Sequence, residues 1–226
     1  MIYMIHACPQ RMWYVEEFLL PSMLAQGILA RDIEIRNDTD GRGNLTMCME
    51  SFRDCGKRTG GTWHLQDDVI LSRDFAERTG KGFDPELVTC GFACRNFGPG
   101  MQESGKVPTV FMWYSFQCVY IPNRIAGECA EWFYSQAVRR SAYETKIAEN
   151  RHDDWFFRQF MLERDPDGRV VNLRPNLADH IDYLIGGTII NPLRRIQVNR
   201  AEFFPDGDLV EELERKLADR TCTKNG

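Results

Sequence analysis

The first 72 residues alternate between short apolar runs and amphipathic stretches, and this alternation limits the fold more than any other feature of the chain. Residues 2–7, 32–36 and 63–72 have the composition of strands, and residues 11–26 and 44–55 carry apolar side chains at helical spacing. Strands that alternate with helices are joined by right-handed crossovers, which place the strands side by side and parallel. The sequence therefore predicts an α/β fold with an open, mostly parallel sheet.

Polar side chains follow each of these three strands at the point where the strand ends. Because ligands of open α/β sheets bind beyond the carboxyl ends of the strands, we expect these side chains to surround one site. The glycine-rich motifs of dinucleotide-binding folds and P-loop NTPases do not occur at the strand-to-helix turns, which argues against both classes. The three clusters are His6-Ala7-Cys8-Pro9, Arg36-Asn37-Asp38 and Gln66-Asp67-Asp68.

The third cluster places two adjacent carboxylates, Asp67 and Asp68, inside an apolar run that resumes at Val69. Carboxylates at the end of a buried strand are costly unless a cation or hydrogen-bond donors meet them. A solvated acidic turn is the simpler interpretation of such a pair. Our hypothesis is that the pair holds a divalent metal bound to a nucleotide diphosphate.

The rest of the chain continues the strand and helix signals, and it contains no internal repeat or Ser/Pro-rich linker. We therefore expect one domain over residues 1–226, with an amphipathic C-terminal helix at 205–220 packed on it. The glycine-containing loop at 95–109 is expected to be a lid, an acceptor-binding loop or a plain surface excursion. Further strands are predicted at 87–93 and 111–121, and further helices at 73–79, 123–133 and 150–165.

Two later features carry candidate chemistry. Asp153 and Asp154 lie at the start of the helix predicted at 150–165, where exposed N–H groups and the helix dipole favour carboxylates. A helix cap explains one of the two. His180 lies in the segment PNLADHIDYLIGGT, and a lone histidine is by default a satisfied structural residue.

Together and in this order, the three signals resemble the GT-A glycosyltransferases, over roughly residues 2–191. Gln66-Asp67-Asp68 is similar to the family's DxD-type motif in its EDD form, with glutamine where an acidic residue is usual. The segment around His180 is similar to the family's PSLVQHIG segment. The resemblance implies a GT-A-like sheet and a metal-dependent transfer of a sugar from a nucleotide-diphosphate donor.

The resemblance also implies residue roles. Asp68 and His180 would bind Mn²⁺ or Mg²⁺, because carboxylate oxygens and neutral imidazole suit these ions beside phosphate. Asp154, or else Asp153, would act as the general base of an inverting transfer. If neither carboxylate lies near the sugar carbon, a retaining route is expected instead. Donor-binding roles fall to Ala7, Pro9, Arg11, Asp38, Gln66 and Asp67.

The expected donor is a UDP-sugar, and the acceptor stays open between a saccharide, a protein and a hydroxymethylated base in nucleic acid. A nucleotidyltransferase is the competing enzyme class, although it usually carries an early glycine-rich phosphate loop where this chain has CPQR. Because Gln66 departs from the family pattern, a catalytically degenerate GT-A-like binding module is the non-enzymatic alternative.

Composition adds limits on partners and location. The formal net charge of −5 and the pI near 5.5 give no support for non-specific nucleic-acid binding. No apolar segment approaches the ~18 residues that a membrane span needs, and the N-terminus lacks the basic region of a signal peptide. The eight cysteines contain no CxxC pair. We therefore expect a reduced, cytoplasmic protein without a membrane partner.

Overall fold

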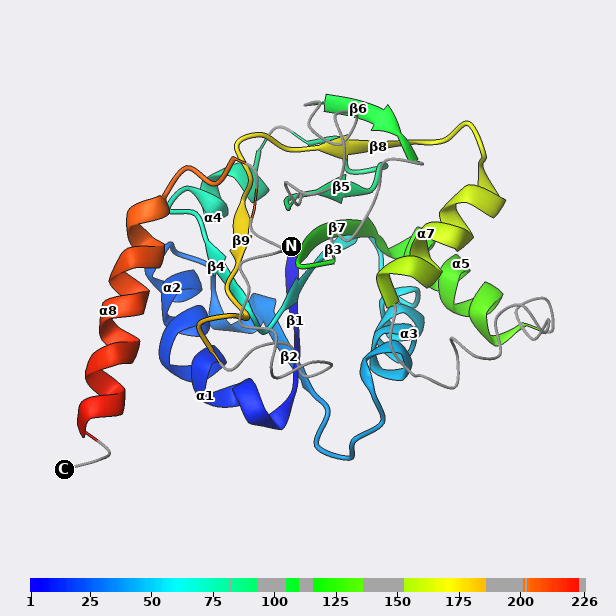
Figure 1. Cartoon of the computed structure of the whole chain (residues 1–226). Helices are drawn as coiled ribbons and strands as arrows, with labels where there is room; N and C mark the ends of the chain where they lie inside the picture. The colour runs from blue at the N-terminus through cyan, green and yellow to red at the C-terminus, as the bar shows by residue number, and fades with distance from the viewer. Residues whose placement is uncertain are drawn as a thin grey trace.

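The computed structural model describes residues 1–81, 83–92, 105–109, 116–135, 153–185, 201 and 203–223 (Figure 1). The strands are β1 Ile2–Ala7, β2 Ile33–Asn37, β3 Gly61–Gln66, β4 Val69–Leu71, β5 Thr89–Cys90, β6 Gly105–Pro108, β7 Cys118–Pro122, β8 Arg169–Asn172 and β9 Ala178–His180. The α-helices are α1 Met12–Tyr14, α2 Leu20–Ala25, α3 Asn44–Cys55, α4 Phe75–Thr79, α5 Asn123–Tyr134, α7 Asp153–Arg164 and α8 Gly207–Thr223. Short 3-10 turns, η1 Pro9–Arg11 and η3 Ala30–Asp32, and the π-turn η2 Val15–Leu19 complete the described elements.

Seven strands form one mixed sheet in the order β2-β1-β3-β7-β5-β8-β6. β1 pairs in parallel with both β2 and β3, and β5 pairs in parallel with β8. β7 runs antiparallel to β3 and β5, and β6 runs antiparallel to β8. Five of the seven strands thus share one direction. The predicted α/β class and mostly parallel sheet are confirmed, with two reversed strands that the sequence did not indicate.

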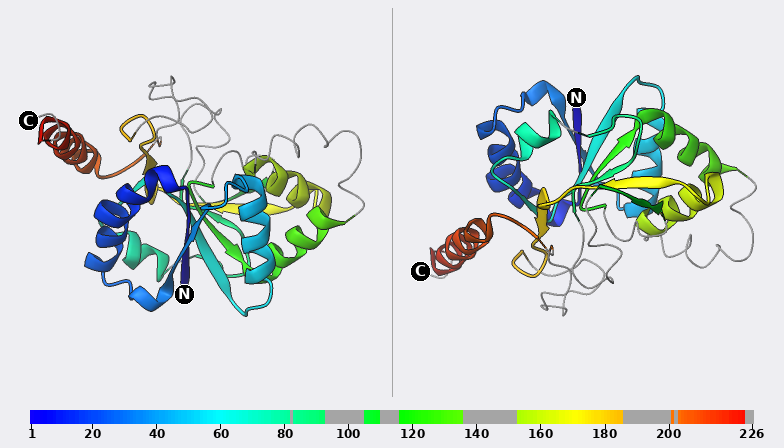
Figure 2. Two further views of the ribbon diagram at one scale, coloured as in Figure 1. Left: turned by 90° about the horizontal axis from the view of Figure 1, so that it is seen from below. Right: turned by 90° about the horizontal axis from the view of Figure 1, so that it is seen from above.

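The sheet is the middle of three layers, because alternate side chains of its strands enter two separate hydrophobic cores. From β1, Met4 packs with helices α3, α5 and α7, whereas Ile5 packs with η2, α2 and α4. From β7, Val119 enters the first core and Tyr120 the second. Figure 2 shows the two groups of helices on opposite faces of the sheet. This is the period-two alternation of strands that are buried on both faces.

A second, two-stranded sheet leaves the main sheet directly after the paired carboxylates. β4 pairs antiparallel with β9, so that Val69 lies opposite His180 and Leu71 opposite Ala178. The hydroxyl of Tyr14 donates to the carbonyl of Val69 (2.8 Å). This bond fixes β4 against the N-terminal helical segment, which runs from η1 to α2 (residues 9–25). The segment 63–72, predicted as one strand, is therefore two strands in different sheets with Asp67 and Asp68 at the corner.

Several boundaries differ from the prediction for local reasons. Helix 11–26 is interrupted by the π-turn η2, just before Pro21, whose missing N–H cannot complete a regular α-helical ladder. Gly43 occupies the N-cap of α3, and the side chain of Asn44, the first residue of that helix, bonds to Asp153 instead of the backbone. The helix predicted at 73–79 begins at Phe75, with Asp74 at its N-cap.

The middle of the chain is only partly described. The loop predicted at 95–109 ends in β6, which pairs with β8, and its residues 95–104 lie outside the described residues. Of the strand predicted at 111–121, residues 118–121 belong to β7 and residues 111–115 lie outside the described part. Within the strand predicted at 87–93, Thr89 and Cys90 form β5, and residue 93 lies outside the described part.

Helix α8, predicted at 205–220, spans Gly207–Thr223 and stands at one side of the molecule (Figures 1 and 2). Val210 and Leu213 are its buried side chains. Among the described helices, none is long and apolar enough to cross a bilayer.

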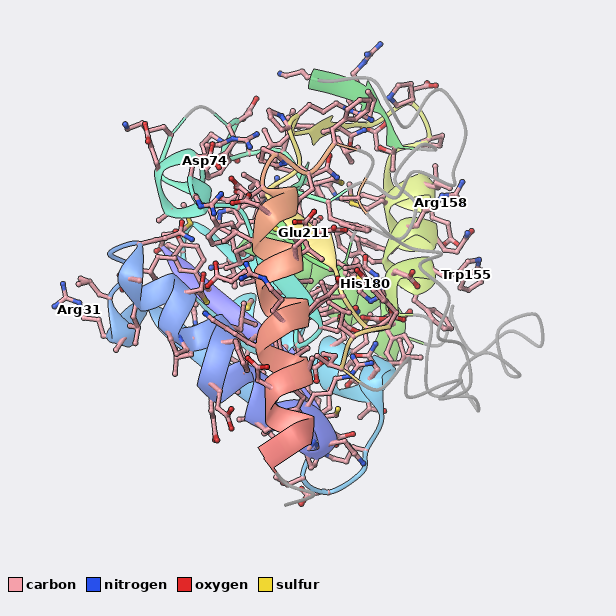
Figure 3. All side chains as sticks on the ribbon, turned by 60° about the vertical axis from the view of Figure 1, so that its left-hand side comes forward. Arg31, Asp74, Trp155, Arg158, His180 and Glu211 are labelled. Atoms are coloured by element: carbon pink, nitrogen blue, oxygen red, sulfur yellow. The ribbon has the colours of Figure 1, made fainter. Side chains whose placement is uncertain are left out.

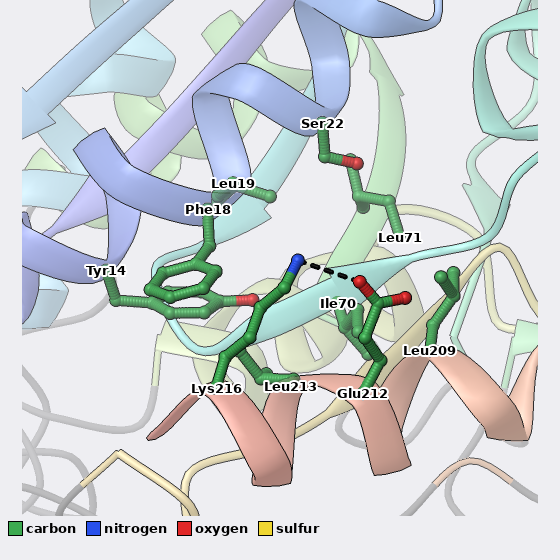
Figure 4. Close-up of a pocket in the computed structure, with 10 residues that line it drawn as sticks. All are labelled: Tyr14, Phe18, Leu19, Ser22, Ile70, Leu71, Leu209, Glu212, Leu213 and Lys216. Atoms are coloured by element: carbon green, nitrogen blue, oxygen red, sulfur yellow. Dashed lines mark ion pairs between the residues drawn. The ribbon is translucent and has the colours of Figure 1, made fainter. Parts of the chain in front are cut away.

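A groove of about 150 Å³ runs between α8 and the N-terminal helical segment (Figure 4). Apolar side chains form most of its walls, and the ion pair between Lys216 and Glu212 (2.8 Å) lies across it. Its inner wall includes Tyr14 and Ile70, but none of the sequence-predicted site residues lines it. The groove is therefore part of the packing of α8, and the predicted site residues lie at the sheet edge instead.

Candidate functional site at the carboxyl edge of the sheet

The three N-terminal strands end at one edge of the sheet. Ala7 lies opposite Asn37, and His6 lies opposite Gln66. The backbone N–H of Asp38 donates to the carbonyl of Ala7 (3.0 Å), which extends the pairing one step beyond β2. The parallel register thus brings the three predicted polar clusters together.

Asp67 is held from two directions. The backbone N–H of Cys8 donates to its Oδ2 (2.8 Å), and Nη1 of Arg11 donates to its Oδ1 (2.9 Å). The 3-10 turn η1 makes the second contact possible, because the N–H of Arg11 bonds back to the carbonyl of Cys8 (3.0 Å) and turns the side chain toward β3. Arg11 is buried, with only 5% of its surface exposed.

Asp68 joins Arg11 to His180. Its Oδ2 accepts from Nη1 of Arg11 and lies 3.1 Å from Nε2 of His180. The backbone repeats this contact, because the N–H of Ile181 donates to the carbonyl of Asp68 (2.9 Å) beside the β4–β9 pair. The structure therefore brings together Asp68 and His180, which are 112 positions apart in the chain. Their role in binding a metal stays a prediction.

Charge and burial oppose each other in this cluster. Burial by itself would raise the pKa of Asp68, but Arg11 and His180 hold that pKa well below its ordinary value. Burial and the neighbouring Asp68 raise the pKa of Asp67, against the opposite effect of Arg11. Burial would lower the pKa of His180, but contact with Asp68 raises it. A single guanidinium thus serves two buried carboxylates, of which Asp68 is the firmly ionised one.

Two acidic residues of the DHID segment support His180 and were not singled out from the sequence. Oδ1 of Asp179 accepts from the backbone N–H of His180 (2.8 Å) and from that of Ala201 (2.7 Å). Oδ1 of Asp182 lies 3.7 Å from Nδ1 of His180. Asp179 therefore fixes the backbone at His180 and Ala201, and Asp182 places a second negative charge near the imidazole without a hydrogen bond to it. In the sequence, the signal that could have identified these two carboxylates is their closeness to His180, one residue before it and two residues after it.

The residues at this cluster suit a hard divalent cation in type, but the protein supplies few ligands. Among the described residues, no group of three or more His, Cys, Asp and Glu side chains converges as a metal site. Oδ1 of Asp68 is buried and has no hydrogen-bond partner in the described part of the chain. Mg²⁺ sites that take most of their ligands from phosphate and water need only one or two carboxylates. Asp68 supplies one such carboxylate, and the imidazole of His180 beside it would be the second protein ligand.

A second set of contacts runs from the end of β2 to the start of α7. The carboxylate of Asp38 accepts from the backbone N–H groups of Arg42 and Gly43 (2.7 Å each) and shapes the loop before α3. Nδ2 of Asn44, the first residue of α3, then donates to Oδ1 of Asp153 (2.8 Å). Asp38, predicted to contact the donor, thus positions a loop that leads to the second acidic pair.

Asp153 and Asp154 open α7, as predicted, but their surroundings differ. Asp153 is buried, and burial together with the charge of Asp154 raises its pKa to about 7. Asp154 is half-buried, and its Oδ1 accepts from the N–H of Trp155 (2.7 Å). Figure 3 shows Trp155 on α7 and His180 on β9, the two elements that carry the later sequence signals. The half-buried Asp154 is the member of the pair that solvent and a ligand can reach.

The other predicted donor-binding residues also lie at this edge. Ala7 is buried at the end of β1, Pro9 is exposed at the start of η1, and Gln66 is half-buried at the end of β3. The backbone N–H of Gln66 donates to the carbonyl of Gln117 (3.3 Å). Their contacts with a donor stay predictions.

Beneath the edge, His6 of the first polar cluster pairs with His64, which the sequence did not indicate. Nε2 of His6 and Nδ1 of His64 are 2.9 Å apart, and the ring of His64 meets the ring of Phe52 edge to face. Burial lowers the pKa of His6 to about 4 and that of His64 well below its ordinary value. Two neutral imidazoles therefore share a hydrogen bond in the floor of the site.

Comparison with known proteins gives no identification: no model of a protein family matches this chain, and no curated protein matches it.

Proposed function

We propose that this protein is a glycosyltransferase of GT-A-like fold that moves a sugar from a nucleotide-diphosphate donor, such as a UDP-sugar, to a hydroxyl group of an acceptor. The observation that carries the proposal is the buried cluster of Asp67, Asp68, Arg11 and His180 beyond the carboxyl ends of three adjacent strands. This is where open α/β sheets bind nucleotides. A cluster of this charge and burial is costly as a purely structural feature.

The donor end of the site follows from the groups available there. Cys8, Asp67 and Arg11 are linked by hydrogen bonds at the end of β1, where a nucleotide and its diphosphate would lie. Arg11 supplies a fixed positive charge for phosphate oxygens. Mn²⁺ or Mg²⁺ held by Asp68 and His180 would neutralise the charge that develops on the departing diphosphate. Asp182 would add a second negative charge beside the imidazole of His180.

The acceptor end is assigned to the start of α7. Asp154 would take the proton of the acceptor hydroxyl as that oxygen attacks the sugar, which gives inversion at the anomeric carbon. Asp153 is buried behind it and is bonded to Asn44, so we assign Asp153 to holding the start of α7. The chain of contacts from Ala7 through Asp38 to Asn44 links this end to the donor end.

A panel of nucleotide sugars tests the proposal with purified protein and Mn²⁺. We expect release of the nucleoside diphosphate from at least one donor, and an Asp68→Asn variant should lose at least about a hundredfold in rate. Asp154→Asn should lose a similar factor in transfer while it keeps nucleotide affinity, because a general base acts only on the chemical step. Asp40→Asn, an exposed carboxylate of the same edge, is the matched control and should retain activity.

Each contrary result points to a different alternative. Absence of both turnover and calorimetric binding of any nucleotide would refute the proposal. Binding of a nucleoside diphosphate without turnover of any donor would indicate a binding module. Release of pyrophosphate from a nucleoside triphosphate would indicate a nucleotidyltransferase.

A reduced compartment such as the cytoplasm is also proposed. Among the described residues, Cys8, Cys48, Cys55, Cys118 and Cys129 carry free thiols, and all of these but Cys8 are buried.

A further inference from the structure

We propose that Arg11 is a built-in counter-cation of the Asp67–Asp68 pair, which a divalent metal must displace in order to bind. The displaced guanidinium would then pass to the diphosphate of the ligand, so that metal and diphosphate bind cooperatively. The first half of this inference concerns only the protein and the metal. The second half rests on the proposed function.

The geometry places one nitrogen atom between two carboxylates. Nη1 of Arg11 donates to both Asp67 and Asp68, and all three side chains are at least nine-tenths buried. The same oxygen of Asp68 that meets Arg11 also meets His180. The protein therefore already has a cation at the place where the sequence predicts a metal.

The charge balance explains why this position always needs a cation. Two carboxylates against one guanidinium leave one negative charge in excess. Without Arg11 both carboxylates would be buried without a full countercharge, which typically costs several kcal/mol. A divalent metal could take over that role, and the buried Oδ1 of Asp68, unpartnered within the described residues, is an acceptor already present for it.

Displacement has a cost that makes metal binding depend on an anion. Arg11 has only 5% of its surface exposed, so its guanidinium cannot leave the carboxylates for water without moving out of the core. A diphosphate at the end of β1 would offer it a new set of anionic oxygens within the site, with the bidentate geometry that guanidinium prefers. A metal that binds alone must therefore compete with Arg11 for the two carboxylates. When a diphosphate binds as well, it accepts the guanidinium, and this competition disappears.

The metal-only half is tested by calorimetric titration of Mn²⁺ into nucleotide-free protein. We expect weak binding to the wild type and binding at least about tenfold tighter to Arg11→Gln, which frees both carboxylates. Arg11→Lys, which keeps a cation, should resemble the wild type. Arg58→Gln is the matched control, because Arg58 pairs with Glu34 on the exposed face of β2. Equal Mn²⁺ affinity of the wild type and Arg11→Gln would overturn the inference.

If Arg11→Gln does not fold alone, circular dichroism in rising Mn²⁺ gives the same answer. Recovery of the folded state by Mn²⁺, and not by an equal ionic strength of Na⁺, supports displacement. If Mn²⁺ gives no recovery, the double variant Arg11→Gln/Asp67→Asn removes one carboxylate along with the guanidinium. Failure of that folded variant to bind Mn²⁺ more tightly than the wild type contradicts the inference.

The cooperative half uses UDP as the probe. In the wild type, saturating UDP should tighten Mn²⁺ binding by about tenfold or more, and in Arg11→Gln most of this coupling should disappear. Undiminished coupling in the variant contradicts the transfer of the guanidinium to the diphosphate. If UDP binds to none of the proteins, the proposed function fails, while the Mn²⁺ comparison without nucleotide still decides the role of Arg11.

Discussion

Asp153 is a buried carboxyl group whose protonation should set the stability of the start of α7. Burial and the neighbouring Asp154 raise its pKa to about 7 from an ordinary value of 3.8, and the hydrogen bond from Asn44 only partly offsets this. The folded chain therefore binds this proton more tightly than the unfolded chain does. Stability linked to the proton is complete below pH 4 and is lost as the pH rises toward about 7.

The size of the effect follows from the pKa difference. A shift of roughly three pH units corresponds to about 4 kcal/mol between the two protonation states. About 3 kcal/mol of this change in stability falls between pH 5 and pH 8, the range in which the two proteins can be compared. An Asp153→Asn variant keeps an acceptor for Asn44 and never ionises, so its stability should not carry this component.

Urea unfolding followed by tryptophan fluorescence at pH 5, 6, 7 and 8 measures the prediction. The free energy of unfolding of Asp153→Asn minus that of the wild type should rise by about 3 kcal/mol from pH 5 to pH 8 and level off above pH 7. Other titrating groups are common to both proteins and cancel in the difference. Asp167→Asn, in the exposed turn after α7, is the matched control for the loss of one carboxylate charge. A flat difference for Asp153→Asn would refute the reasoning.

Two further variants test the packing of the helices. Gly127→Ala should destabilise the protein by about 1–3 kcal/mol, because a Cβ there would come within 2.9 Å of the Cα of Gly56, directly after α3. Gly207→Ala, with open space around it, should be close to neutral in the same urea unfolding. Leu213→Ala removes one of the buried side chains of α8 and should cost about 2 kcal/mol, with faster proteolysis of the C-terminal helix. The exposed Glu211→Ala should change neither, and equal proteolysis of the two variants would show that α8 is held elsewhere.

The convergence of the strand ends was predictable because it follows from local signals. Apolar runs separated by helical stretches fix the parallel order of β1, β2 and β3, and parallel order places their carboxyl ends at one edge. The polar residues after each strand then meet without any further information. The alternation of Met4 and Ile5 between two cores follows from the same pattern.

The partners within the site were less predictable, because they depend on long-range packing. Arg11 was assigned to the nucleotide, and nothing in its local sequence indicated that a 3-10 turn would bring it onto Asp67 and Asp68. Asn44 carries a signal for a helix cap, but its side chain bonds to Asp153, 109 positions away. His180 reaches Asp68 through the antiparallel pair β4–β9, which the sequence did not indicate. The resemblance implied only that the two side chains share a metal site.

The same physics separates the two interpretations of the acidic pair. A solvated acidic turn would leave Asp67 and Asp68 exposed, yet both are about 95% buried. Burying two carboxylates and a guanidinium costs desolvation energy that their mutual attraction repays only in part, so apolar residues of similar size would serve stability as well or better. A cluster that stability does not explain, with a strongly perturbed pKa at Asp68 and an unpartnered oxygen within the described residues, is the kind of arrangement that functional sites keep. Replacing all three side chains by apolar ones should therefore leave the fold intact or more stable, while it removes every activity at this edge. Thermal denaturation of an Arg11→Met/Asp67→Leu/Asp68→Leu variant decides between these accounts, because a cluster that served mainly to hold the fold would leave the variant unfolded.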